Sequence, residues 1–172
     1  ESIWIAGLAS YTGWLLPYDR PILLVLDDPV HIDNVVRTLV RIGYDNIAGY
    51  LWGGIVQWCH DNMPFRSLRT ASVHELKAWL DANDSMMILD PRPSHEWAKV
   101  HLQEAKHIFV GELEDNLAQV PRDRLIASMC SVGYRGGMAA AILERNGYDN
   151  LVNILGGVSA WTAAGYPVIT GK

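Results

Sequence analysis

The sequence predicts an α/β fold, in which helices cover both faces of a parallel β-sheet, duplicated along the chain with the first copy truncated. The length of 172 residues suits one domain or two small ones. Short apolar runs alternate with helix-like segments, a pattern typical of parallel sheets. A repeated segment also relates the two halves of the chain. With 49% hydrophobic and 19% charged residues, the chain has the composition of a globular protein.

The repeat sets the expected domain boundaries. RIGYDNI (41–47) matches RNGYDNL (145–151), 104 residues further along, and GGIVQW (53–58) matches GGVSAW (156–161) at an offset of 103. The longer offset pairs Ser2 with Lys106, so the given sequence holds no counterpart of residues 70–104. We expect a truncated first copy at 1–60, a linker at 61–69 and a complete copy at 70–172. Either the chain is a fragment of a longer protein, or the missing strand and helix come from elsewhere.

The complete copy reads as alternating helices and strands. Ser72 and Glu75 form a capping box for a helix that ends near Asp81. A buried parallel strand at 86–89 ends at Asp90 and Pro91, and chemistry often lies at such strand ends. We also expect strands at 108–110, 125–129 and 151–155, a short helix at 113–117, a helix at 139–145 capped by Gly147, and a helix at 158–164.

Cys130 directly follows the strand at 125–129 and opens the segment CSVGYRGG. Three glycines, at positions 133, 136 and 137, permit a tight loop whose N–H groups point inward, and Arg135 adds a positive charge. Such a loop binds anions and favours the thiolate, the nucleophilic form of cysteine. The alternative interpretation is a buried cysteine that acts as a small hydrophobic residue. The spacing between Cys130 and Arg135 is one residue shorter than in cysteine phosphatases, which favours a smaller, sulfur-centred group.

CSVGYR (130–135) resembles the Cys-x-x-Gly-x-Arg loop of the rhodanese family of sulfurtransferases. ILDPRPSHEW (88–97), VHLQEAKHI (100–108) and GGVSAWTAAGYPV (156–168) resemble further motifs of that family, and the resemblance extends over residues 72–171. Departures from the family pattern are Val100 and Glu104 in place of two glycines and His107 in place of an asparagine. The resemblance therefore implies a rhodanese-like fold.

The resemblance also implies a mechanism. Cys130 would take a sulfane sulfur from a small donor such as thiosulfate or glutathione persulfide and pass it to cyanide or a thiol, without a cofactor. The loop that binds substrate or persulfide would comprise Ser131, Val132, Gly133, Tyr134, Arg135 and Gly136. Asp90 and Arg92 would support the sheet edge beside this loop. Arg135 would either orient an anionic donor or brace the loop.

The first copy lacks these residues. The offset of 104 places Leu26, Pro29 and His31 at the positions of Cys130, Gly133 and Arg135. We therefore expect the first copy to be structural. WLLPYDRPILLVLDD (14–28) resembles the C-terminal part of metallo-β-lactamase/rhodanese fusion proteins, which implies an N-terminal metallo-β-lactamase domain in the full-length protein.

Two other function classes remain open: a cysteine phosphatase or arsenate reductase, and a non-catalytic regulatory binding module. A net charge of -5 argues against binding to nucleic acid or anionic membranes. No apolar run has the length of a membrane helix, and ESIWIAGLAS (1–10) does not resemble a signal peptide. Two cysteines without metal-ligand spacing favour the cytoplasm and predict no metal site. Cys59, expected in the linker region, is a candidate resolving thiol or a residue without a chemical role.

Overall fold

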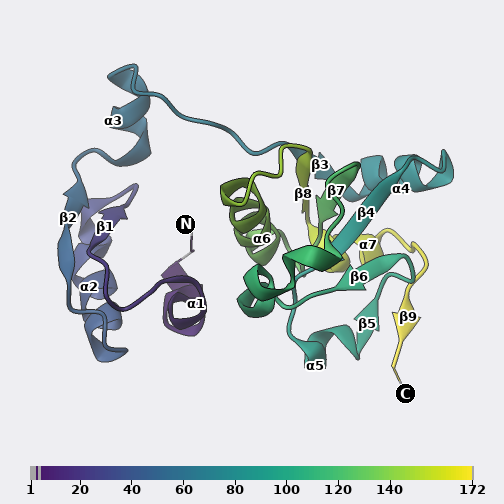
Figure 1. Ribbon diagram of the computed structural model, residues 1–172, viewed down its shortest axis with the longest axis horizontal. Helices are drawn as coiled ribbons and strands as arrows, with labels where there is room; N and C mark the ends of the chain where they lie inside the picture. The colour runs from purple at the N-terminus through teal and green to yellow at the C-terminus, as the bar shows by residue number, and fades with distance from the viewer. Residues whose placement is uncertain (1–2, 4, 172) are drawn as a thin grey trace. The chain divides into compact units, whose positions relative to one another are not determined.

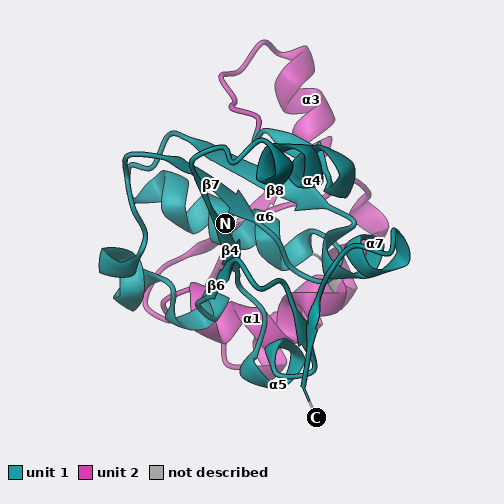
Figure 2. Ribbon diagram, turned by 90° about the vertical axis from the view of Figure 1, so that its right-hand side faces the viewer, with its two compact units in different colours: residues 1–2, 68–172 teal, residues 3–67 magenta. Residues whose placement is uncertain are grey.

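The computed structural model describes residue 3 and residues 5–171. Its contacts divide the chain into two compact units, residues 3–67 and the residues from Leu68 onward (Figure 2). The chain passes between them through residues 63–69, which form no helix or strand. None of the helices in the described ranges is long and apolar enough to cross a membrane.

The second unit is built on a five-stranded sheet with the order β3-β8-β7-β4-β6, in which every pairing is parallel (Figure 1). The strands are β3 (Thr70–Ser72), β4 (Met86–Asp90), β6 (Ala105–His107), β7 (Leu125–Ser128) and β8 (Leu151–Leu155). The helices are α4 (Val73–Asp81), α5 (Ser94–Trp97), α6 (Tyr134–Arg145) and α7 (Gly157–Ala163). The remaining elements are two 3-10 helices, Val110–Glu112 and Glu114–Gln119, and an antiparallel pair of β5 (Val100–His101) with β9 (Ile169–Thr170).

Helices cover both faces of this sheet. On one face, Ala127 of β7 and Ile154 of β8 are buried in a cluster with Leu76 of α4 and Trp161 of α7. On the other face, α6 packs on β7 and β8. Burying both faces explains why the three central strands β8, β7 and β4 are mostly apolar, as is usual for parallel sheets, whereas the edge strands β3 and β6 carry polar residues. The expected α/β class, with a parallel sheet between helices, is confirmed.

The first unit has a two-stranded parallel sheet of β1 (Ile22–Val25) and β2 (Ile47–Leu51). Its helices are α1 (Leu8–Leu15), α2 (Ile32–Arg41) and α3 (Gly54–His60), with 3-10 turns at Ile5–Gly7 and Pro29–His31. A small core forms on one face of the sheet, where Leu24 packs with Val35, Leu39 and Tyr44.

The two units share structural details at the offsets of the repeat. The range of β2 reproduces that of β8 shifted by 104 residues, and the range of α3 reproduces that of α7 shifted by 103. Tyr44 donates its hydroxyl to the carbonyl of Leu16, and Tyr148 does the same to that of Val120. Trp58 and Trp161 each donate their indole N–H to the carbonyl of a proline six residues later. These contacts support the duplication, which stays a prediction.

Several expected elements are confirmed and others are wrong. The capping box at Ser72 and Glu75 forms, and Gly147 has the positive φ of a helix C-terminal position. The strand expected at 108–110 lies at Ala105–His107, because pairing ends where β4 ends, and Ile108 then donates to the carbonyl of Asp90. The helix expected at 113–117 is a pair of 3-10 helices.

Two further expectations need correction. The helix expected at 139–145 begins at Tyr134, so Gly136 and Gly137 are helical rather than part of the loop. Gly136 is required by packing, since a Cβ there would overlap the side-chain oxygen of Asn153. Cys59 is exposed in α3 and does not lie in an irregular linker.

Candidate active site

The cysteine loop lies at the carboxyl edge of the central sheet. β7 ends at Ser128, and Met129 donates its N–H to the carbonyl of Leu89 in β4 at 2.9 Å, so Cys130 emerges beside the end of β4. Carboxyl ends of parallel strands meet at one edge, where ligands of open α/β sheets bind. Only 1% of the Cys130 residue is exposed, so the thiol is enclosed by its own loop.

The start of α7 holds the loop backbone. Cys130 and Ser131 accept hydrogen bonds on their carbonyls from the N–H groups of Val158 (2.8 Å) and Ser159 (3.1 Å). Val132 accepts from Gly156 at 3.1 Å. The N-cap and first turn of α7 thus hold three successive carbonyls of the loop.

Gly133 supplies the donor that reaches the thiol. Its N–H lies 3.0 Å from Sγ of Cys130, and its φ of +127° is a backbone conformation that only glycine adopts readily. The Gly133 carbonyl accepts from Nδ2 of Asn153 at 3.0 Å and from the N–H of Gly137 at 2.9 Å. The Val132–Gly133 peptide, whose N–H points at the sulfur, is held through its carbonyl by the N–H of Gly156, and the buried amide of Asn153 holds the next peptide.

Arg135 and Ser131 are both tied to Glu96 of α5. Arg135 donates to the two carboxylate oxygens of Glu96 at 2.5 and 2.9 Å and to Oγ of Ser131 at 2.8 Å. Ser131 in turn donates to Glu96 at 2.8 Å. A bidentate arginine–carboxylate pair is geometrically well defined. Of the two roles expected for Arg135, this geometry supports bracing of the loop.

The environment of Glu96 favours its ionised form. Partial burial acts to raise the pKa of Glu96, but hydrogen bonds from Arg135 and Ser131 and the charges of Arg135 and Arg92 outweigh it and hold the pKa below its ordinary value. Glu96 is thus a fixed negative anchor for the loop.

This shift predicts an acid-dependent loss of stability. Since the pKa of Glu96 is lower in the folded chain than its ordinary value of 4.5, the carboxylate stabilises the fold at every pH above 4.5. The stabilisation is lost as pH falls through the lower, folded pKa. We expect the difference in free energy of unfolding between wild type and Glu96→Gln to be constant above about pH 5 and to shrink in more acidic buffer, as measured by urea unfolding.

The matched control for this prediction is Glu114→Gln. Glu114 pairs with Arg145 on the surface, with both side chains about half exposed, and exposed pairs contribute little to stability. Its effect should therefore be smaller at every pH. A Glu96→Gln difference that stays constant down to the acid transition contradicts the prediction.

Asp90 and Arg92 form a buried ion pair beside the loop. Arg92 donates from Nε to both oxygens of Asp90 at 2.9 Å and from Nη2 to Oδ2 at 2.6 Å, and only 3% of either side chain is exposed. Arg92 also donates to the carbonyl of Val100 at 2.7 Å, and its own carbonyl lies 2.6 Å from Nε2 of His107. The pair thus connects the end of β4 to β5 and β6.

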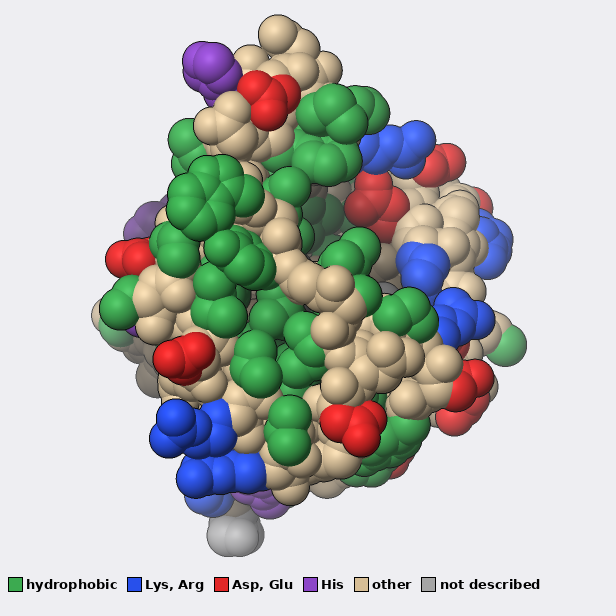
Figure 3. Space-filling model, turned by 90° about the vertical axis from the view of Figure 1, so that its left-hand side faces the viewer, with side chains coloured by type: hydrophobic (Ala, Val, Ile, Leu, Met, Phe, Trp, Pro, Cys, Tyr) green, Lys and Arg blue, Asp and Glu red, His purple; other side chains and the backbone are tan. Residues whose placement is uncertain are grey.

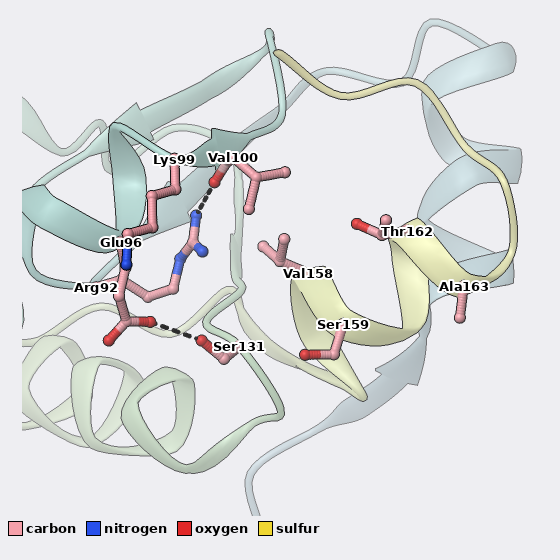
Figure 4. Close-up of a pocket in the computed structure, with 9 residues that line it drawn as sticks. All are labelled: Arg92, Glu96, Lys99, Val100, Ser131, Val158, Ser159, Thr162 and Ala163. Atoms are coloured by element: carbon pink, nitrogen blue, oxygen red, sulfur yellow. Dashed lines mark hydrogen bonds between the residues drawn. The ribbon is translucent and has the colours of Figure 1, made fainter. Parts of the chain in front are cut away.

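An open cavity of about 560 Å³ lies against the loop (Figure 4). Arg92, Glu96 and Ser131 line one side, and α7 contributes the opposite side (Figure 4). Its wall carries the cationic side chains of Arg92 and Lys99 and the hydroxyls of Ser131, Ser159 and Thr162. Glu96 lines the same wall, where its charge is paired with Arg135, and the charge of Arg92 is paired with Asp90. Within the described ranges, no group of three His, Cys, Asp or Glu residues is arranged to hold a metal ion.

The sequence prediction named the loop but missed two of its supports. Glu96 lies in the motif ILDPRPSHEW, but nothing in the sequence assigned it a role. Its partner Arg135 is 39 positions later in the chain, and only the fold brings the two together. Asn153 interrupts the otherwise apolar strand LVNIL, and a polar residue within a buried strand was the available signal. Of the predicted loop residues, Val132 and Tyr134 are exposed, and neither lines the cavity described above.

The second unit is thus a parallel α/β sheet with a buried cysteine at its carboxyl edge and a backbone N–H of the surrounding loop directed at the sulfur. A family model described as "Rhodanese-like domain" matches residues 72–164, more than half of the chain. The chain therefore belongs to the rhodanese family, as the motifs indicated.

Two curated relatives illustrate the match. YrkF of Bacillus subtilis is 29% identical over 103 residues, which make up 60% of this chain and 56% of YrkF. The thiosulfate sulfurtransferase GlpE of Actinobacillus pleuropneumoniae is 28% identical over 95 residues, 55% of this chain and 88% of GlpE. The chain thus spans only about half the length of YrkF.

Solved structures agree on the fold. A rhodanese-related protein from Thermoplasma volcanium aligns with a TM-score of 0.53 and 28% identity, covering 59% of this chain and 97% of that one. A thiosulfate sulfurtransferase from Pseudomonas aeruginosa aligns with a TM-score of 0.55 over 98% of this chain and 36% of that one. At 22% identity, the second similarity concerns the fold alone.

Proposed function

We propose that the second unit is a sulfurtransferase that carries a sulfane sulfur on Cys130. The observation that carries this proposal is the Gly133 N–H, 3.0 Å from Sγ of Cys130, in a loop that α7 holds in place. A donor fixed beside Sγ stabilises negative charge on it, both in the thiolate that attacks the donor and in the thiolate that leaves when the persulfide is consumed. The name of GlpE, a thiosulfate sulfurtransferase, supports the same reaction type.

The proposed reaction has two steps. The Cys130 thiolate attacks the outer sulfur of thiosulfate, the sulfur–sulfur bond breaks, and sulfite leaves with the bonding electrons. Glutathione persulfide reacts in the same way and releases the glutathione thiolate. In the second step cyanide or a thiolate attacks the terminal sulfur of the persulfide, which regenerates the Cys130 thiolate and yields thiocyanate or a new persulfide.

The cavity fits the donors of this reaction. Both donors are anions, and Lys99 brings a positive charge to the cavity while Ser159 and Thr162 offer hydrogen bonds. The charges of Arg92 and Glu96 are already paired with Asp90 and Arg135. The chemistry uses no bound metal or organic cofactor, since the thiolate is itself the nucleophile and the leaving group.

We also propose that the first unit is structural. Leu26 follows β1 where Cys130 follows β7, so this position carries no nucleophile. Asp27 and Asp28 come next and would repel an anionic donor.

Intact mass spectrometry of wild type and Cys130→Ser, after brief incubation with thiosulfate or glutathione persulfide, tests the proposal. We expect wild type to gain the mass of one sulfur atom, to lose it on addition of cyanide, and Cys130→Ser to gain nothing. The control Cys59→Ser should behave as wild type, because Cys59 lies exposed in α3 and outside the loop. Wild type that gains no sulfur from either donor refutes the proposal, as does a gain that persists in Cys130→Ser.

A further inference from the structure

The cavity beside the cysteine loop is larger than the smaller of the two proposed donors requires. Its volume of about 560 Å³ lies within the range of about 300–1,000 Å³ that is typical of pockets for organic ligands. A thiosulfate ion would fill only a small part of it. Ser131 of the loop lines the cavity, whereas Cys130 does not. Most of the cavity is therefore available to the part of a donor that does not react.

Lys99 carries a charge on the cavity wall that no neighbour neutralises. Arg92, on the same wall, is paired with Asp90. Glu96 is paired with Arg135. Within the part of the chain that the structure describes, Lys99 is exposed and takes part in no ion pair. It lies on the side of Arg92 and Glu96, opposite α7 (Figure 4), and leaves an uncompensated positive charge there.

The opposite wall combines hydroxyl groups with apolar surface. Ser159 and Thr162 are three residues apart in α7, which places both on one face of the helix. Neither hydroxyl bonds to another group of the described chain, so both are available to donate to a ligand and to accept from it. Val158 and Ala163 add apolar contacts beside them. Such a wall suits a peptide-like ligand with amide groups better than a compact inorganic anion.

We infer that Lys99 is a specificity-determining residue, whose ammonium group binds a carboxylate of a peptidic thiol persulfide while the amides of that donor lie along Ser159 and Thr162. The inference rests on the proposed function and names the class of donor, an organic persulfide of about the size of glutathione persulfide. The transfer step balances as before. The Cys130 thiolate bonds to the outer sulfur, the sulfur–sulfur bond breaks, and the thiolate of the donor leaves with the bonding electrons.

Calorimetric binding of S-methylglutathione to Cys130→Ser tests the inference without any sulfur transfer. This thioether keeps the carboxylates and amides of glutathione but has no transferable sulfur, and its diethyl ester keeps the amides without the carboxylate charges. We expect Lys99→Met, added to Cys130→Ser, to weaken binding of the acid about fivefold, the upper end for an exposed ion pair. Binding of the ester should not change.

Two further variants of Cys130→Ser serve as controls. Lys106→Met removes another exposed lysine, which lies in β6 and does not line the cavity. Leu23→Asp alters β1 of the first unit, where Leu23 is 73% exposed and hydrophobic side chains form a broad patch on the side that Figure 3 shows. Exposed apolar surface is a second place where the ester could bind. Both controls should bind both ligands as Cys130→Ser does.

A kinetic measurement with Cys130 present completes the test. Lys99→Met should lower kcat/KM for glutathione persulfide more than for thiosulfate, which fills less of the cavity. Equal losses for the two donors overturn the inference, as do equal losses for acid and ester, or no binding of S-methylglutathione to Cys130→Ser. A chain that takes sulfur from thiosulfate but fails the binding test keeps the proposed function and loses this inference. A chain that passes the binding test but takes up no sulfur contradicts the proposed function instead.

Discussion

Arg92→Ala should lower the free energy of unfolding by about 3–5 kcal/mol, as expected when one partner of a buried ion pair is removed. The Asp90 carboxylate is then left in a site where 3% of its side chain reaches solvent. It loses the three hydrogen bonds that the guanidinium donates, and the carbonyl of Val100 loses its donor. Guanidinium chloride unfolding followed by tryptophan fluorescence measures the change.

A double replacement tests whether the unpaired buried charge causes this loss of stability. In Asp90→Asn with Arg92→Met no buried charge remains, and buried pairs exchanged for neutral residues of similar size often cost little. The double variant should therefore be more stable than Arg92→Ala. Arg124→Ala, which removes an exposed pair with Asp123, should leave the unfolding midpoint unchanged. A double variant as unstable as Arg92→Ala would show that the lost hydrogen bonds of Arg92, and not the charge left on Asp90, decide the effect.

The elements that could be predicted from the sequence are those that a local pattern of residues determines. The strand at 151–155 and the capping box at Ser72 follow from a run of apolar residues and from residue spacing, and both are present as expected. The strand at 105–107 escaped prediction because Ile108 and Val110 are apolar and buried like strand residues. Where β6 stops depends on where its neighbour β4 ends, and local sequence does not contain that information.

At the candidate site, too, local sequence predicted some residues, whereas contacts between distant segments determine others. Cys130, Gly133 and Arg135 are adjacent in sequence, so their grouping could be predicted from spacing alone. Glu96 and Asn153 are brought to the loop by the order of strands and helices, and their roles depend on contacts across at least 20 residues. In α6, packing outweighs the low helix propensity of glycine. Gly136 and Gly137 both lie in this helix, and Gly136 packs against Asn153 of β8 so closely that a Cβ would overlap it.

Gly157→Ala should be the most damaging glycine substitution in the second unit. Gly157 has a φ of +51°, which costs a non-glycine residue about 1–2 kcal/mol. A Cβ there would also overlap the carbonyl oxygen of Cys130 and lie 2.6 Å from the carbonyl carbon of Ser131. Backbone atoms cannot move aside as a flexible side chain does, so we expect a further overpacking cost of about 1–3 kcal/mol.

Gly165→Ala is the control that separates strain from collision. Gly165 has a comparable φ of +73°, but a Cβ there meets no atom within 4 Å. Both variants carry the conformational cost, whereas only Gly157→Ala pushes on the cysteine loop. Urea unfolding should therefore show the larger loss in free energy of unfolding for Gly157→Ala. Iodoacetamide should alkylate the buried Cys130 faster in that variant alone. Equal losses in the two variants would mean that the contact between the start of α7 and Cys130 does not hold the loop.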